Sequence, residues 1–374
     1  MSNTKFSNYK SEDGNTGPDL VGITSFTSPY YFVPPSGTTA QRPSNAVPGQ
    51  LRFNTDIGRL EVWRGDHWAT ILGESPNLNG GARGVFGGGY FAPTAANNSN
   101  VIDYVSISSL GNAIDFGDLT QARRGLNSCA SSTRGLFTGG YVDTAPTNGY
   151  KTRIDFITIS STGNAATFGD LSGSRFTAAS CSSSTRGVIG GGENGVSPAS
   201  NVIDYVTIAS TGNAQDFGDM YTGTTRNYGS CSSSVRGIFA GGDLFPTLTN
   251  VIQYITISTL GNSIDFGDLL SAGAHRSCSN STRGLFLDGI GNNIISFITI
   301  ASLGNAQDFG DITVIRGASG ACASPTRGLF GGGGTGSNVI DYVTILSTGN
   351  AVDFGDLTQA RTQTSACSNG HGGL

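Results

Sequence analysis

The chain has 374 residues, 57 of them glycine, and only 13% are charged; average proteins have about half that share of glycine and about twice that share of charge. The formal net charge of −5 argues against a nucleic-acid partner, because a phosphate-binding surface needs clustered Lys and Arg. No apolar run reaches the roughly 18 residues of a membrane helix, and no basic-then-apolar leader begins the chain. We therefore expect no membrane insertion.

The first 80 residues predict two segments that differ from the rest of the chain. Residues 1–42 show no regular pattern, and we expect an irregular attachment arm. Residues 43–80 contain a small β-meander and a linker, with strands at 51–54, 59–63 and 68–71. Three such strands bury too little to be stable alone. We expect this region to attach to copies of itself or to other proteins through Tyr30, Tyr31, Phe32, Phe53, Trp63 and Trp68.

A repeat about 44 to 52 residues long fills residues 81–374. Each copy has Arg-Gly followed by an apolar strand, at Arg83, Arg134, Arg186, Arg236, Arg283 and Arg327. A Ser/Cys-rich segment precedes every copy except the first, and the missing one stands at the other end, around Cys367. A ring that closes by pairing its last strand with its first unit requires this offset. The repeat therefore predicts an all-β fold, a six-bladed β-propeller.

One unit shows the strands of such a blade. In the second copy we expect strands at residues 125–131, 134–137, 153–160 and 165–171, with alternating side chains and short turns between them. Four short antiparallel strands per unit are typical of a propeller blade. The C-terminal strand would then complete the first blade.

Two motifs recur in every unit. A Phe-Gly-Asp string lies in the last strand, and we interpret its Phe as a wedge that fills the space between adjacent sheets. The Asp of this string and the Arg that opens the second strand are equally regular. We expect them to pair within or between blades, as structural residues of the repeat: Arg134, Asp170, Arg186, Asp219, Arg236, Asp268 and Arg283.

The six cysteines occur once per repeat at one equivalent place. Equivalent positions in neighbouring blades should lie further apart than the roughly 7 Å limit between Cα atoms for a disulfide. We therefore expect six buried, reduced thiols that act as small apolar side chains. Their spacing does not match a zinc site.

Sequence variation is concentrated at one edge of the expected blades. The turns after the first and third strands are short and uniform, whereas the loops after the second strand and the connections between blades differ in every copy. Loops on a rigid scaffold often carry recognition; alternatively, these loops vary because nothing constrains them. The candidate ligand-binding residues are Tyr90, Phe91, Asn97, Tyr141, Asp143, Asn148, Glu193, Asn194, Asp243, Phe245, Asn292 and Asn293.

Two resemblances follow from these residues. Residues 83–374, with Gly-Gly after the second strand and an aromatic in the third, resemble kelch-type propellers, although Phe replaces the Trp of kelch units. Residues 42–56, Gly58 to Trp63, and Trp68 resemble a short module of bacteriophage virion proteins. That module is common in tail fibres and related appendages, particularly of phages that infect marine cyanobacteria.

The second resemblance implies a virion structural protein on the particle surface. Its N-terminal region would contact other virion proteins, the propeller would face outward, and a homotrimer would be usual for such a fibre. Our leading hypothesis is a tail fibre or appendage whose variable loops bind a glycan or protein on the host surface. The alternative is a purely structural component of the neck, baseplate or capsid, whose propeller contacts other virion proteins.

An enzymatic role is the third class of function. The repeat region contains no Trp, so the Asp boxes of sialidases are absent, and its two histidines, His275 and His371, stand in different units. A copper site of the galactose oxidase type would need more histidines. We expect no catalytic residues, no cofactor and no metal.

Overall fold

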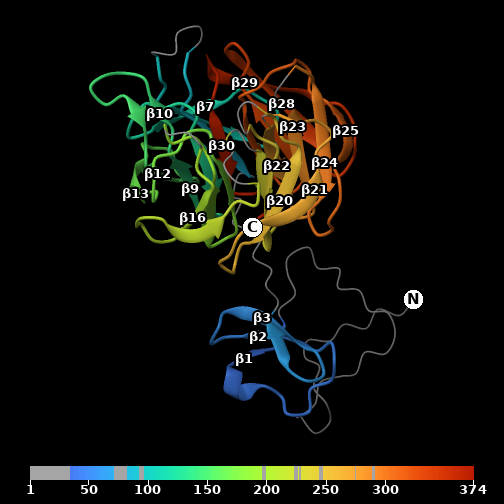
Figure 1. Cartoon of the computed structure of the whole chain (residues 1–374). Coiled ribbons are helices and arrows are strands. Elements are labelled where there is room, and N and C mark those ends of the chain that lie inside the picture. Colours follow the sequence, from blue (N-terminus) through green and yellow to red (C-terminus); the bar gives the residue numbers. More distant parts are fainter. Residues whose placement is uncertain are drawn as a thin grey trace. The chain divides into compact units, whose positions relative to one another are not determined.

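The computed structural model describes residues 34–70, 82–91, 97–195, 199–222, 226, 229–243, 247–273, 275–288 and 291–374. These residues form an all-β protein, and none of the helices among them is long and apolar enough to cross a membrane. The chain divides into two compact units, Met1–Ser75 and Pro76–Leu374 (Figure 1).

The N-terminal unit contains one sheet in the order β1-β2-β3-β4. The predicted meander is present as β2 (Leu51–Asn54), β3 (Arg59–Trp63) and β4 (Trp68–Thr70). The segment expected to be irregular also contributes a strand, β1 (Ser36–Gly37), which pairs in parallel with β2. Backbone hydrogen bonds from β2 and the following turn hold this segment in place. The amide of Phe53 donates to the carbonyl of Pro35 at 2.7 Å, and the amide of Thr55 donates to the carbonyl of Gly37 at 3.0 Å.

The C-terminal unit contains six four-stranded antiparallel sheets among its described residues. In order from the innermost strand, sheet one is β30 (Ser365–Ser368), β5 (Arg83–Gly87), β6 (Val101–Ser106) and β7 (Ile114–Asp118). Sheet two is β8 (Asn127–Ala130), β9 (Arg134–Thr138), β12 (Arg153–Thr158) and β13 (Ala166–Asp170). Sheet three is β14 (Ala179–Ser182), β15 (Arg186–Gly190), β16 (Val202–Thr207) and β17 (Gln215–Asp219).

The remaining sheets repeat this order. Sheet four is β18 (Gly229–Ser232), β19 (Arg236–Ala240), β20 (Val251–Thr256) and β21 (Ile264–Asp268). Sheet five is β22 (His275–Ser279), β23 (Arg283–Asp288), β24 (Ile294–Thr299) and β25 (Gln307–Asp311). Sheet six is β26 (Gly320–Ala323), β27 (Arg327–Gly331), β28 (Ser337–Thr344) and β29 (Val352–Arg361). A small hairpin, β10 (Tyr141–Val142) and β11 (Gly149–Tyr150), follows β9.

The strand around Cys367 pairs with the first Arg-Gly strand, where the sequence predicts it. In this pairing Ser365 lies opposite Gly87 and Cys367 opposite Val85. The innermost strands also contact one another in sequence, from β8 through β14, β18, β22 and β26 to β30, which contacts β8 again. Figure 1 shows β22 and β30 toward the middle of this unit and β13 and β25 at its outside.

The repeated arginines connect neighbouring sheets, but not through the predicted ion pairs. Arg134 lies over the ring of Phe156, 4.8 Å from its centroid, and donates to the carbonyl of Ile208 in the next sheet at 3.1 Å. Arg327 donates to Ile107 in the same way, from sheet six to sheet one. The other copies follow the same pattern: Arg83, Arg186, Arg236 and Arg283.

The predicted pairing of these arginines with the Asp of Phe-Gly-Asp is therefore wrong. Asp170 accepts a hydrogen bond from Thr152, and its amide donates to the Asn213 side chain of the next sheet at 3.1 Å. The amides of Asp219 and Asp268 make the equivalent bond. The guanidinium is instead held over the aromatic ring of the third strand, within reach of backbone carbonyls.

The Phe of the same motif packs as predicted. Phe116 of sheet one is buried and clusters with Ile157 and Ile159 of sheet two. Its ring meets that of Tyr104 edge-on, with centroids 5.9 Å apart, a favourable geometry for two aromatic side chains.

The glycine of each Arg-Gly pair makes room for a cysteine. All six cysteines are free and buried, and burial raises the pKa of Cys129 to about 12. A Cβ atom on Gly187 would lie 2.8 Å from the sulfur of Cys129 in the preceding sheet. The Arg-Gly and Cys positions are thus one packing unit that spans two sheets.

We predict that Gly187→Ala lowers the free energy of unfolding by about 1–3 kcal/mol, the usual cost of overpacking. Adding Cys129→Ala, which removes the obstructing sulfur, should recover part of this loss. Urea unfolding of the two variants and of Cys129→Ala alone measures the coupling. Strictly additive effects would contradict the contact.

Among the residues that the structure describes, four buried ion pairs, which the sequence analysis missed, fix connections between sheets. Arg123, in the connection from β7 to β8, contacts Asp155 of β12 at 2.6 Å, and both side chains are fully buried. Arg123 also donates to the carbonyls of Gly139 and Arg153. The equivalent pairs are Arg175–Asp204, Arg316–Asp341 and Arg361–Asp103.

Candidate functional site

The variable loops and the connections between sheets lie side by side. Isolated β-bridges join residues of four of these loops to residues of the connections, in the pairs Tyr90–Thr362, Arg124–Tyr141, Phe176–Glu193 and Arg226–Asp243. We call this edge, formed by the loops after the second strands and the connections between sheets, the variable rim.

An aromatic cluster surrounds one cation on the variable rim. The guanidinium carbon of Arg124 lies 5.6, 5.1 and 5.1 Å from the ring centroids of Tyr90, Tyr141 and Phe176. Tyr150 adds a fourth ring, 5.0 Å from Tyr141 and edge-on to it. All four aromatic side chains are partly exposed. Contacts of this kind hold the arginine in place through cation–π attraction.

Carboxylates complete the cluster. Asp143 contacts Arg124 at 2.7 Å, and Arg226 contacts both Glu193 and Asp243. Tyr150 donates its hydroxyl to Glu193 at 2.8 Å. Burial, together with this hydrogen bond, raises the pKa of Tyr150 to about 12, so the hydroxyl remains a donor at neutral pH. Loops from sheets one to four are thereby cross-linked in a fixed arrangement.

The predicted ligand-binding residues divide into two groups. Tyr90, Tyr141, Asp143, Glu193 and Asp243 belong to the cluster or contact it, whereas the others lie around it or in another sector. Asn97 and Asn148 are exposed, Phe91, Asn194 and Asn293 are partly buried, and Phe245 lies outside the described residues. Asn292 donates to Asp288 of sheet five.

Sequence reasoning missed four members of the cluster, Arg124, Tyr150, Phe176 and Arg226. Arg124 and Phe176 each follow a buried arginine of the ion pairs, at equivalent positions in two connections. The sequence signal that could have identified them is the large side chain that directly follows both Arg123 and Arg175.

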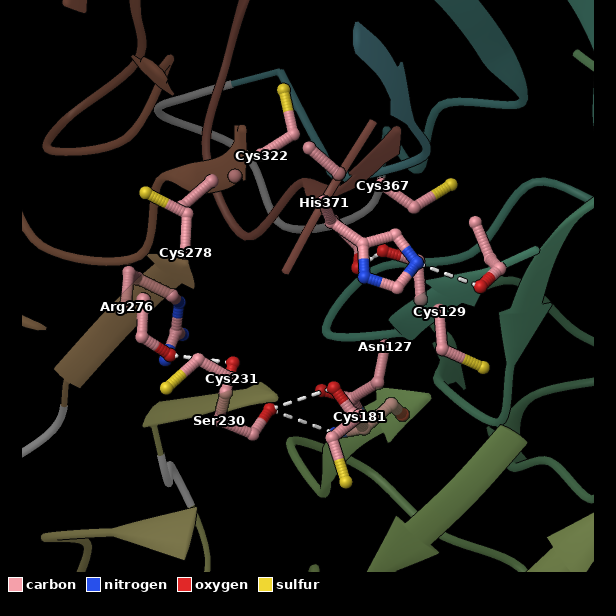
Figure 2. Close-up of a pocket in the computed structure, with 18 of the residues that line it drawn as sticks. Asn127, Cys129, Cys181, Ser230, Cys231, Arg276, Cys278, Cys322, Cys367 and His371 are labelled. Carbon is pink, nitrogen blue, oxygen red and sulfur yellow. Dashed lines mark hydrogen bonds between the residues drawn. The ribbon is translucent and has the colours of Figure 1, made fainter. Parts of the chain in front are cut away.

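A central cavity of about 100 Å³ lies between the innermost strands. Serine, threonine and cysteine residues dominate its lining. Figure 2 shows the six cysteines around it with their sulfur atoms directed away from its centre, toward the glycines of the adjoining sheets. Among the described residues, no group of His, Cys, Asp and Glu could hold a metal ion.

One end of the cavity is closed by the last residues of the chain. His371 donates from Nε2 to the carbonyl of Ala130 at 2.8 Å and accepts the amide of Gly373 at Nδ1 at 3.0 Å. The amide of Gly372 donates to Ser279 at 2.9 Å. At the other end, Gln363 lines the cavity and also accepts a hydrogen bond from Arg124. The cavity therefore adjoins the variable rim.

We predict that His371 makes the protein less stable in acid. Burial lowers the pKa of His371 below the ordinary 6.5, so the unfolded chain takes up a proton more readily than the folded one. The stability that neutral His371 contributes is fully present above about pH 6.5, the ordinary pKa of histidine. It is lost as the pH falls from 6.5 to the lowered pKa of the folded protein. Urea unfolding between pH 4 and 8 should show this loss, and His371→Asn should flatten it. An unchanged slope in the variant would contradict the assignment.

Comparison with known proteins adds no relative. A scan of the sequence against protein-family models gave no match, and a search of curated proteins found none with significant similarity.

Proposed function

We propose that Pro76–Leu374 is a six-bladed, kelch-like β-propeller whose variable rim recognises a glycan on a host surface. The six four-stranded sheets, the pairing of β30 with β5 and the contact of β30 with both β26 and β8 support the propeller. This arrangement gives one uniform edge and one variable edge. The proposal includes no catalytic step and no cofactor.

The aromatic cluster around Arg124 is the observation that supports recognition. Partly exposed tyrosine rings give a ligand a rigid, amphipathic contact at low entropic cost. The carboxylates of Asp143 and Glu193 are fixed by ion pairs and offer acceptors for sugar hydroxyls. Because the loops are cross-linked before any ligand arrives, little ordering remains to oppose binding.

We further propose that the protein is a virion appendage of the tail-fibre type. The resemblance of residues 42–68 to a phage module is the basis, and the N-terminal unit offers a surface for assembly. Among the described residues of this unit, the exposed large apolar side chains are Val47, Leu51, Ile57 and Leu60. Phe53, Trp63 and Trp68 belong to its sheet, whereas Tyr30, Tyr31 and Phe32 lie outside the described residues. Light scattering of the full chain tests for the expected trimer.

A glycan array probed with the full chain tests recognition. We expect binding to a restricted set of glycans, and Tyr141→Ala should weaken it at least about tenfold, as loss of an aromatic anchor does. The matched control is Leu260→Ala, an exposed side chain in a turn at the other edge. No bound glycan, or equal loss in both variants, would contradict the proposal and favour the purely structural role.

A further inference from the structure

A short segment spans the end of the central cavity that lies away from the variable rim. The side chain of His371 donates to the carbonyl of Ala130 in sheet two at 2.8 Å, and the amide of Gly372 donates to the carbonyl of Ser279 in sheet five at 2.9 Å. Figure 2 shows His371 inside the ring of six cysteines that surrounds the cavity. We call residues 371–374 the plug, because they connect two sheets on opposite sides of the cavity.

The plug has glycine where its backbone approaches the innermost strands most closely. A Cβ atom on Gly372 would lie 2.1 Å from the carbonyl oxygen of Asn280, and a Cβ atom on Gly373 would lie 1.8 Å from the carbonyl oxygen of Ser182. Contacts this short leave no room for a side chain at either position. Within the plug, His371 is the residue whose side chain lines the cavity.

The hydrogen bonds of His371 require a neutral imidazole. Nε2 faces the carbonyl of Ala130, which can only accept, so this nitrogen carries the ring proton. Nδ1 accepts the amide of Gly373 at 3.0 Å, so this nitrogen carries none. A second proton on the ring would set one N–H against another at Gly373 and break that bond. The closed plug and a protonated His371 therefore exclude each other.

The other titratable groups around His371 keep their charge state between pH 5 and 8. The described lining residues include six cysteines and Arg276 but no carboxylate. Burial raises the pKa of all six thiols, which stay neutral. Burial lowers the pKa of Arg276 only to about 10, so its guanidinium stays charged. The terminal carboxylate at Leu374, in the turn after His371, is ionised throughout this range.

Backbone hydrogen bonds join the connections at the rim end of the cavity. Gly125, Thr177, Ala318 and Gln363 occupy equivalent positions there, with φ angles of 58, 50, 58 and 54°. The amide of Gln363 donates to Ala318, that of Gly125 to Gln363, and that of Thr177 to Gly125. Bonds between backbone amides and carbonyls do not titrate in this pH range. Mild acid therefore acts on the plug and leaves these bonds unchanged.

We propose that the plug is released by acid: protonation of His371 frees residues 371–374 and opens the cavity at the end away from the variable rim, while the six sheets stay folded. Opening is local, because β30 keeps its own pairing with β5. Burial lowers the pKa of His371 in the closed state below 6.5, the value expected of the released side chain. Release therefore increases as the pH falls below about 6.5. This inference does not depend on glycan recognition.

Amide hydrogen exchange of the full chain at pH 7.5 and pH 5 tests the release. Protection factors correct for the intrinsic pH dependence of exchange. We expect those of the Gly372 and Gly373 amides to fall about 3- to 10-fold at pH 5, the usual contribution of the one hydrogen bond that protonation removes. The amides of Ser365–Ser368 in β30 should stay at least about 100-fold more protected than the plug at both pH values, because they exchange only through larger openings.

Two variants separate protonation from the fit of the plug. His371→Asn keeps an oxygen acceptor for the amide of Gly373 but does not titrate, so the plug should have the same protection factors at both pH values. Gly373→Ala should expel the plug at any pH, because its Cβ atom would overlap the carbonyl of Ser182. At pH 7.5 the Gly372 amide of this variant should be no better protected than that of the unaltered chain at pH 5.

Three results would overturn the proposal. They are equal protection of the plug amides at pH 7.5 and pH 5 in the unaltered chain, the same fall in His371→Asn, or a loss of protection in β30 down to the level of the plug. The last result would show that acid opens the ring of sheets and not the plug alone. The comparison of the unaltered chain at two pH values does not require either variant to fold.

Discussion

Arg123→Ala is expected to lower the free energy of unfolding by about 3–5 kcal/mol, the usual cost of leaving one member of a buried ion pair without its partner. Asp155 would keep a buried charge, and among the described residues only the amide and hydroxyl of Thr120 would still donate to it. The carbonyl of Gly139 would lose this donor as well, and that of Arg153 would keep only the amide of Gly139. Urea unfolding at pH 7 measures the loss.

The chain itself supplies the matched control for this prediction. In sheet five, Ser296 occupies the position equivalent to that of Asp155 in sheet two: Ser296 pairs with Phe286 as Asp155 pairs with Phe137. Gly273 occupies the position of the arginine. The amide of Gly242 donates to the carbonyl of Gly273 in the same way that the amide of Gly140 donates to the carbonyl of Arg175. The double variant Arg123→Ala/Asp155→Ser should therefore recover much of the stability. Equal losses in the single and double variants would show that the unpaired carboxylate is not the cause.

A chain that ends at Gln363 is expected not to fold cooperatively. This truncation removes β30, which pairs with β5 along its length. It also removes Ala366 and Cys367, which belong to the clusters between sheets six and one and between sheets one and two. The loss should exceed the roughly 5–15 kcal/mol net stability of a domain. Circular dichroism during heating shows whether a cooperative transition remains.

A chain that ends at Gly370 is the control for the truncation. It keeps β30 and loses only the residues that close the cavity, so it should unfold cooperatively, with a loss of about 1–3 kcal/mol. If the chain that ends at Gln363 keeps a cooperative transition at a similar temperature, the last strand is dispensable and the ring does not depend on it.

The regular parts of the repeat could be predicted from the sequence because each strand carries its own signal. The Arg-Gly strands, the Phe wedge and the buried cysteines all recur at fixed places, and the structure has them there. Regularity alone did not identify the partners of charged side chains. Arg134 and Asp170 recur together, but the guanidinium is covered by the ring of Phe156 and reaches a carbonyl of the next sheet.

The buried ion pairs had a signal that sequence reasoning did not use. Arginine precedes the innermost strand in the sheets whose third strand carries Asp103, Asp155, Asp204 or Asp341. Gln253 in sheet four and Ser296 in sheet five occupy the position of this Asp. In sheet five the arginine is also replaced, by Gly273. Joint substitution of two positions within one chain indicates contact.

No pattern in the sequence predicts the strained residues beside the cavity. Gly125, Thr177, Ala318 and Gln363 share a backbone conformation but no side-chain chemistry. Their φ angles follow from hydrogen bonds between neighbouring connections, which depend on the assembled sheets. The cavity between the innermost strands is likewise a product of several sheets, so no single repeat predicts it.

Hydrogen–deuterium exchange of the full chain tests most directly whether the final strand completes the first sheet. We predict that the amides of Ser365–Ser368 are protected to the same degree as those of Ala179–Ser182 in β14, since both would be innermost strands of one cooperative unit. Complete exchange of Ser365–Ser368 within seconds, beside a protected β14, would show an open ring and contradict the account.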